Sequence, residues 1–165
     1  MTPASILYWA TFCSALGSGL IAGVFFAFSV FVMSALARLP AAQGIAAMQS
    51  INITVINPWF MIVFVGTAVV CTALLVASIV PSPVSRPGLL IIACLLYLIG
   101  TILVTGVANV PRNDALAAVA PQSAEGARLW ADYLQAWTQW NHVRTFSSLF
   151  ASALFTFVLH FPTKP

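Results

Sequence analysis

The residues best suited to chemistry lie on one face of the segment from residue 128 to residue 161. Five side chains recur there at spacings of three and four, which places them along one side of a helix: Tyr133, Trp137, Asn141, Arg144 and Ser148. Aromatic rings at the outer end of this face lead to amide and guanidinium groups deeper in. Rings can hold a flat molecule and hydrogen-bond donors can stabilise a negative charge, so the face indicates a ligand pocket. A membrane-interface belt, with Trp130 and Trp140 as further members, is the alternative for the tryptophans.

Arg144 is the most unusual of these residues because of its predicted depth in a membrane. The apolar stretch after it, residues 146–161, forms about 24 Å of helix, too short for the roughly 30 Å hydrocarbon layer. The membrane must therefore begin nearer Trp137 or Asn141, which leaves Arg144 below its surface. An arginine at that depth costs at least about 2.5 kcal/mol.

Arg144 therefore needs a partner, and its own helix offers no carboxylate three or four residues away. The predicted partner is one of four groups: the carboxylate of Asp114, the carboxylate of Asp132, a helix-end carbonyl such as that of Asn109, or an anionic or enolate ligand. A structural clamp or a snorkelling side chain is the other interpretation of Arg144.

His142 is the candidate for proton transfer, although it does not share the face of Arg144. The two residues lie about 160° apart around the helix. A hydrogen-bonding role without catalysis is the alternative for His142. The chain has 2 histidines and 3 acidic residues, so no cluster of metal-ligand type can be drawn from the sequence. We therefore expect no metal or haem site.

The elements that must position these residues are membrane-spanning helices. The 165 residues contain 61% hydrophobic and only 5% charged side chains, and the mean hydropathy is +1.02. A soluble domain is usually about 25% charged. We predict an all-α integral membrane four-helix bundle that forms a single transmembrane domain over residues 1–165. The predicted spans are residues 5–36, 58–80, 88–110 and 128–161, each long enough to cross a bilayer.

Prolines and polar residues predict where these helices begin and end. Asn57 and Pro58 combine a cap with a proline at the first helical position. The segment PSPVSRP, residues 81–87, predicts a turn after the second span, and Pro111 predicts the end of the third because it cannot donate to a helical ladder. Residues 41–56 have helical spacing but are less hydrophobic. They predict an extra interfacial helix between spans 1 and 2.

Most of the unusual polar residues belong to one end of the predicted bundle. Four alternating spans bring the ends of the first and third and the starts of the second and fourth to the same membrane face. The residues at that end are Gln49, Asn52, Asn57, Asn109, Arg112, Asn113, Asp114, Asn141, His142 and Arg144. We therefore expect any site of chemistry at this polar end.

The composition also limits the partners of the chain. Six basic residues are scattered without forming a stripe, which excludes nucleic-acid binding, and the three cysteines lack paired spacing and predict packed thiols. Ala15, Gly19, Gly23 and Ala27 recur every four residues, which allows another helix to approach closely. We expect packing within the chain, with a homodimer through Gly19 and Gly23 as the alternative. The lipid bilayer is the expected main partner of a multi-pass protein of the cell (inner) membrane.

Taken with their order, these residues resemble the anthrone oxygenase-like family of small four-helix membrane proteins. The matching stretches are GLIAGVFFAFSVFVMSAL, MQSINITVINPWF, VTGVANVPRNDALAAV and WADYLQAWTQWNHVRTFSS. The N-V-P-R-N-D-A-L element and the W-x(6)-W-x-x-W-N-H-V-R run are the most specific of them. Together the stretches cover most of the chain outside the termini and the PSPVSRP segment.

The resemblance implies oxygenation of anthrones, flat tricyclic phenols, to anthraquinones without a metal, a flavin or another cofactor. Removal of a proton would give an electron-rich enolate that reacts with oxygen, while the protein supplies a base, anion stabilisation and a dry site. The residues expected near the enolate oxygen are Arg144, Arg112, Asn109 and Asn141, with His142 or Asp114 as the proton acceptor. The ring is expected near Trp137, Tyr133 and Phe25 or Phe28. The other residues expected at the substrate are Asn52, Asn57, Asn113 and Trp140.

Two other classes of function fit the same sequence. A non-catalytic membrane protein that binds or passes a lipophilic molecule, such as a quinone or a lipid, would use the same aromatic pocket. An assembly subunit would instead use the small residues around Gly19 and Gly23. Oxygen consumption separates the enzyme from the binding protein, and stable copurifying partners would identify the assembly subunit.

Overall fold

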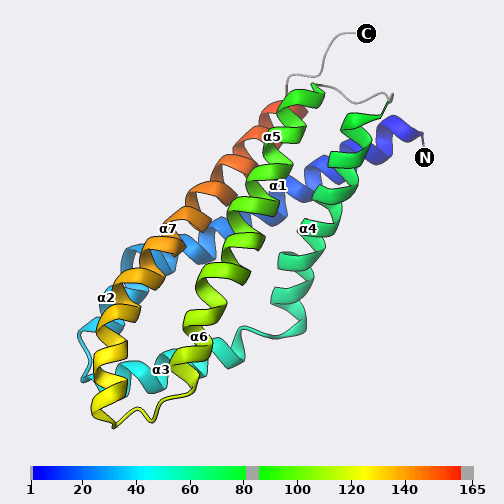
Figure 1. The fold of residues 1–165 in the computed structure, drawn as a ribbon. Helices are drawn as coiled ribbons and strands as arrows, with labels where there is room; N and C mark the ends of the chain where they lie inside the picture. The colour runs from blue at the N-terminus through cyan, green and yellow to red at the C-terminus, as the bar shows by residue number, and fades with distance from the viewer. Residues whose placement is uncertain (1, 81–85, 161–165) are drawn as a thin grey trace.

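The computed structural model describes residues 2–80 and 86–160, and every element in these ranges is helical (Figure 1). The elements are α1 (Pro3–Ala27), a π-helical segment (Phe28–Val32), α2 (Met33–Ala37), α3 (Ala41–Thr54), α4 (Pro58–Ile79), α5 (Pro87–Tyr97), two further π-helical segments (Leu98–Leu103 and Thr105–Asn109), α6 (Val110–Ala117) and α7 (Ala124–His160). This confirms the predicted all-α class.

Four helices among the described residues are long and apolar enough to cross a membrane. They are Pro3–Ala37, Pro58–Ile79, Pro87–Ala117 and Ala124–His160. Their order and approximate bounds agree with the predicted spans, and α3 is the predicted extra helix between the first two. The chain is thus a helical integral membrane protein. Residues 81–85 of the predicted turn and the predicted last residue of the fourth span, Phe161, lie outside the described residues.

Local capping explains where three of the helices begin. Thr2 accepts a hydrogen bond from the backbone N–H of Ser5 and precedes Pro3, which starts α1. Asn57 accepts from the backbone N–H of Phe60 at 3.1 Å, with Pro58 as the first residue of α4, as predicted. Ser123 accepts a hydrogen bond from the backbone N–H of Gly126. α7 therefore begins at Ala124, before the start that was predicted at Arg128.

The third span differs from its prediction at Pro111. The prediction that this helix ends at Val110 is wrong, because α6 continues to Ala117. The preceding segment Thr105–Asn109 is π-helical, and the N–H of Val110 donates to the carbonyl of Thr105. Pro111 therefore falls in the first turn of α6, where a missing N–H is tolerated.

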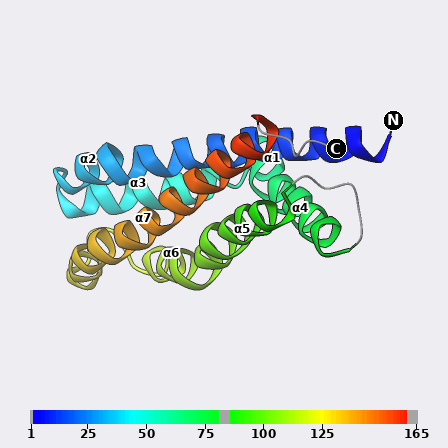
Figure 2. The same ribbon diagram turned by 90° about the horizontal axis from the view of Figure 1, so that it is seen from above.

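The long helices bring the predicted polar end together. The end of α2, all of α3, the start of α4, the end of α6 and the start of α7 lie at the lower end of Figure 1. There α3 runs across the bundle and packs against α2, α6 and α7. α4 packs against α1 and α5, and toward the polar end it lies apart from α6 in both views (Figures 1 and 2).

The core has two parts, one in each half of the bundle. One buried cluster centres on α1, α4, α5 and the end of α7, and contains Tyr97 and Phe155. The second cluster, at the polar end, joins α2, α3, α6 and the start of α7. The stripe of small residues on α1 faces α7 in part: a side chain at Gly19 would meet Ser152, whereas one at Gly23 would meet open space. The homodimer through these glycines stays a prediction.

Candidate functional site

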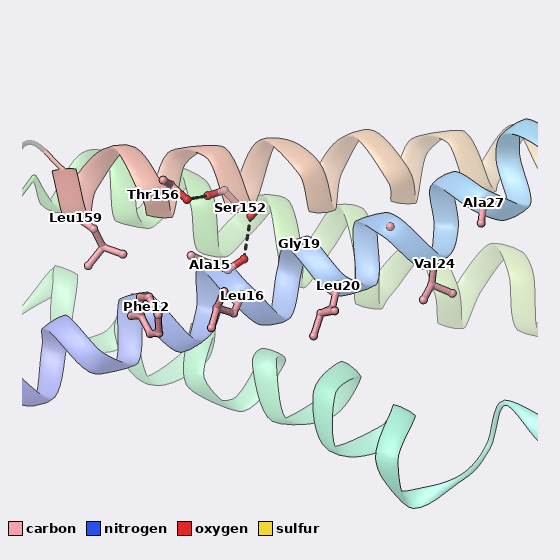
Figure 3. A pocket seen from close by; sticks show the side chains of 11 residues that line it. Phe12, Ala15, Leu16, Gly19, Leu20, Val24, Ala27, Ser152, Thr156 and Leu159 are labelled. Carbon is pink, nitrogen blue, oxygen red and sulfur yellow. Dashed lines mark hydrogen bonds between the residues drawn. The ribbon is translucent and has the colours of Figure 1, made fainter.

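One hollow among the described residues is a groove on the outside of α1 and α7 (Figure 3), with a volume of about 850 Å³. Its lining is apolar apart from Ser152 and Thr156. The hydroxyl of Ser152 donates to the carbonyl of Ala15, and that of Thr156 donates to the carbonyl of Ser152. Both hydroxyl protons are thus used within the protein, so the groove offers little that could recognise a specific ligand.

A second, smaller hollow is a cavity of about 250 Å³ inside the polar half of the bundle. Ligand sites usually measure about 300–1,000 Å³, so this cavity suits a compact molecule and not a whole phospholipid. Most of its lining is aliphatic or aromatic. The lining residues are Val24, Phe25, Phe28, Met48, Ile51, Asn52, Val55, Ile56, Phe60, Met61, Phe64, Thr105, Val110, Asn113, Trp137 and Arg144.

The guanidinium of Arg144 lies in the wall of this cavity between two aromatic rings. Arg144 is only 4% exposed. Its Cζ atom lies 4.1 Å from the ring centroid of Phe25 on α1 and 4.9 Å from that of Trp137 on α7. A desolvated cation over an aromatic face gains about 2 kcal/mol, so these rings offset part of the cost of burying the charge.

The hydrogen bonds of Arg144 come from neutral groups. Its Nη2 donates to Oδ1 of Asn141 at 2.7 Å, and its Nη1 donates to the hydroxyl of Thr105 at 3.3 Å. Its Nε is buried without a hydrogen-bond partner. The acidic residues of the described chain, Asp114, Glu125 and Asp132, are all exposed and none pairs with Arg144. The cavity therefore holds a positive charge that no carboxylate cancels, with one donor still unused.

Asn141 fixes the position of this cation relative to α1. Its Nδ2 donates to the carbonyl of Phe25 at 2.7 Å and to the hydroxyl of Ser29 at 2.8 Å. Ser29 is the second residue of the π-helical segment Phe28–Val32. Its hydroxyl oxygen also lies 3.1 Å from the hydroxyl oxygen of Thr145. The amide is completely buried. One face of α7 is thereby tied to α1 at the level of Arg144.

A stack of aromatic rings leads from the polar end to the cavity. Trp130 and Tyr133 stack at 5.5 Å between centroids, and Tyr133 and Trp137 stack at 6.0 Å. Oδ1 of Asn113 on α6 accepts from both the phenol of Tyr133 and the indole of Trp137, at 2.8 and 2.9 Å. These polar contacts hold the Trp137 ring against the cavity, where it also meets Phe28.

Two more asparagines near the cavity carry buried atoms without partners. Asn52 lines the cavity, and its Nδ2 has no hydrogen-bond partner. Asn109 donates to the carbonyl of Trp137 at 3.2 Å, while its Oδ1 is unpartnered. A buried donor left without a partner costs about 1–3 kcal/mol. Asn52 and the Nε of Arg144 are therefore the groups of the cavity that a ligand acceptor would satisfy.

The structure separates the predicted site residues into three sets. Those that line the cavity are Asn52, Asn113, Trp137 and Arg144. Those that support it by contact with a lining residue are Asn109, Tyr133 and Asn141. Those that it does not bring to the cavity are Asn57, Arg112, Asp114, Trp140 and His142.

Each member of the third set has a visible reason for its position. Asn57 caps α4, and Arg112 donates to the carbonyl of Ala108 one turn earlier. Asp114, Trp140 and His142 are exposed on the outer surfaces of α6 and α7. The angle of His142 around its helix, already evident from the sequence, places it away from Arg144.

Two residues that take part in the hydrogen bonds of Asn141 and Arg144 were not predicted from the sequence. They are Ser29 and Thr105. Ser29 is a single hydroxyl in an apolar stretch, whereas Thr105 lies four residues after Thr101, and each belongs to a π-helical segment. A hydroxyl in a predicted span was the available signal. Its meaning depended on a partner from α7, which helical spacing along one segment does not reveal.

Comparison with known proteins adds one finding to this geometry. A family model described as anthrone oxygenase matches residues 59–154, a range that includes all of α4 except Pro58, all of α5 and α6, and most of α7. No curated protein and no solved structure matches the chain. Among the described residues no group of three histidine, cysteine or acidic side chains is placed to hold a metal ion.

Proposed function

Because the chain belongs to the anthrone oxygenase family, we propose that it is a membrane-embedded, cofactor-independent oxygenase. Its substrate would be a lipophilic aromatic molecule of the anthrone or quinol type, taken up in the cavity beside Arg144. The cell (inner) membrane is the proposed location.

The observation that carries the proposal is the guanidinium of Arg144, buried and without a carboxylate partner in the cavity wall. A buried cation is stable only where something negative or strongly polar meets it. Its Nη atoms have neutral partners, and its Nε has none. A substrate that becomes an anion during the reaction would complete this set of contacts.

The reaction needs stabilisation of that anion more than it needs a cofactor. Loss of a proton from the ring CH₂ of an anthrone gives an enolate, which dioxygen can attack at the same carbon. The carbon ends as a ketone with one oxygen atom from O₂, and the second oxygen atom leaves as water with the two hydrogens. Arg144 would stabilise the enolate oxygen by charge and hydrogen bonding, which typically lowers such a barrier by about 3–4 kcal/mol.

The other lining residues have roles that follow from their chemistry. Trp137 and Phe25 flank the guanidinium and present apolar surface to a flat ring, and Asn52 offers a free N–H donor. The proton acceptor was predicted to be His142 or Asp114. Neither side chain lines the cavity, so this role stays a prediction. Exclusion of water by the aliphatic lining would strengthen each of these polar contacts.

A non-catalytic protein that binds or passes a quinone or another lipophilic molecule is the second candidate. The observation in its favour is that no carboxylate or imidazole of the described residues lines the cavity. Such a protein would still use Arg144 and Asn52 as donors to the oxygen atoms of a quinone. It would bind the ligand without converting it.

Oxygen consumption distinguishes the two functions. Purified protein in lipid vesicles would be given 9-anthrone, and oxygen uptake would be followed together with quinone formation. Protein-free vesicles and the Arg144→Met protein supply the background rate of uncatalysed oxidation. An enzyme is expected to exceed this background by about 100-fold or more, in proportion to protein concentration. Saturable binding of 9-anthrone with oxygen uptake at the background rate would instead identify the binding protein.

A further inference from the structure

The cavity is bordered by side chains that are exposed on the surface of the protein. Three of its lining residues have this property: Val24 on α1, Ile56 between α3 and α4, and Val110 on α6. All three are aliphatic, and Ile56 is 72% exposed. We refer to Val24, Ile56 and Val110 together as the lateral opening.

The surface around the lateral opening is one that belongs in lipid. Trp59 at the start of α4 and Val107 in the segment before α6 are also strongly exposed apolar side chains. An apolar surface of this extent is unfavourable in water. Val24, drawn on α1 in Figure 3, also lines the outer groove, so the groove and the cavity have this lining residue in common. The side chains of the lateral opening are therefore suited to contact with hydrocarbon.

The end of the cavity nearest to water is closed by packing instead. Met48 of α3 lines the cavity and is buried together with Ile45 and Leu116 in the cluster at the polar end. Nε2 of Gln49 donates to the carbonyls of Leu116 and Val119, at 2.8 and 3.1 Å, which fastens α3 to the end of α6. On the water side α3 therefore covers the cavity with tightly packed side chains.

From this contrast we propose that the ligand reaches Arg144 from the bilayer, through the lateral opening, and not from water. The proposal rests on the proposed function only in that the cavity takes a lipophilic molecule. Side chains at the lateral opening touch the ligand during its passage. Their bulk therefore limits the rate at which the ligand associates with the protein.

The test compares two double variants with the same substitutions. Ile56→Phe with Val110→Phe narrows the lateral opening. Ile62→Phe with Val69→Phe adds the same bulk at exposed positions of α4 that do not line the cavity. Each protein, in lipid vesicles, is mixed rapidly with 2-methyl-1,4-naphthoquinone while tryptophan fluorescence is recorded. The Trp137→Phe protein identifies the part of the signal that comes from the cavity.

We expect the ligand to associate with the variant that has the narrowed opening about tenfold more slowly than with its control. Equal association rates in the two double variants would overturn the lateral opening while leaving the binding site intact. A wild-type protein without saturable quenching dependent on Trp137 would overturn the proposed function itself.

A charged probe tests the route from water. The compound 1,4-naphthoquinone-2-sulfonate carries a negative charge that keeps it out of hydrocarbon. Added outside the vesicles, it should leave the Trp137 signal unchanged while the methyl compound quenches it. Quenching by both compounds at the same rate would show that the ligand enters from water, and the proposal would be rejected.

Discussion

Arg144 and Asn141 lie one turn apart on α7, and Nη2 of the arginine donates to Oδ1 of the asparagine at 2.7 Å. The same amide donates from its Nδ2 to the carbonyl of Phe25 on α1. Its orientation is therefore fixed from both sides. Because the amide is neutral, it holds the guanidinium in place without cancelling its charge. The charge stays available to whatever occupies the cavity.

Replacement of Asn141 by aspartate should show how much of ligand binding depends on the charge of Arg144 and how much on the orientation of its side chain. A carboxylate at this position would pair with Arg144 and cancel the charge that a ligand meets. We expect the affinity for 2-methyl-1,4-naphthoquinone to fall by about tenfold or more. Ligand-dependent thermal stabilisation in one detergent provides the measurement. Asn141→Leu is the companion variant: it leaves Nη2 of Arg144 without a partner and should lower the free energy of unfolding by about 1–3 kcal/mol. Wild-type affinity in the aspartate protein would contradict the role given to the neutral amide.

Removal of the charge at Arg144 should cost activity and not stability. In Arg144→Met an apolar side chain of similar length replaces the buried cation. The cost of burying the charge disappears together with the hydrogen bond to Asn141, so the melting temperature is expected to change little. Oxygen uptake with 9-anthrone should fall about 100-fold. Arg144→Lys keeps the charge but loses the planar group between Phe25 and Trp137, so it should restore only a small part of the rate. A methionine protein that melts much earlier, with full turnover in the fraction that remains folded, would assign Arg144 the role of a structural clamp.

The fold could be predicted further from the sequence than the site could. Span length, hydropathy and alternating topology place Asn113, Trp137 and Arg144 at one end, because these rules need no knowledge of side-chain contacts. The partner of Arg144 was not predicted. Its two neutral acceptors, Asn141 and Thr105, depend on the approach of α7 to a π-helical segment, and no simple period encodes such a segment. The prediction that the third span ends before Pro111 was wrong for the same reason, because the effect of a proline depends on the turn that precedes it.

Two glycines of α1 should respond oppositely to the same substitution. A Cβ atom at Gly17 would overlap the hydroxyl of Thr67 on α4, whereas a Cβ atom at Gly23 has open space around it. Gly17→Ala is therefore expected to lower the free energy of unfolding by about 1–3 kcal/mol through overpacking. Gly23→Ala should leave it unchanged or raise it by up to about 1 kcal/mol, because alanine favours the helix. Thermal melting of both proteins in one detergent tests this, and equal destabilisation would contradict the packing of α1 on α4.

Gln49 offers a test of how α3 is held over the polar end. Its Nε2 donates to the carbonyl of Leu116 in the last turn of α6 and to that of Val119 just after the helix, where no further backbone donors are offered. Gln49→Leu keeps most of the side-chain volume and removes this donor, so we expect a loss of about 1–3 kcal/mol in stability. The loss should be local, because the hydrogen bonds join only α3 and α6. Backbone amides of residues 41–54 and 110–117 are therefore expected to exchange hydrogen faster, while those of α7 beyond Arg144 keep their protection.

The matched control for Gln49 is Gln43→Leu, the same substitution at an exposed position of the same helix. It should leave hydrogen exchange in α3 and α6 unchanged, which separates the lost donor from the added apolar side chain. The two variants also differ in what they predict for access from water. If the Gln49 hydrogen bonds keep α3 closed over the cavity, only Gln49→Leu should allow 1,4-naphthoquinone-2-sulfonate to quench Trp137. Faster exchange in α3 without such quenching would mean that the packed side chains of Ile45, Met48 and Leu116 close this end even when the hydrogen bonds are gone.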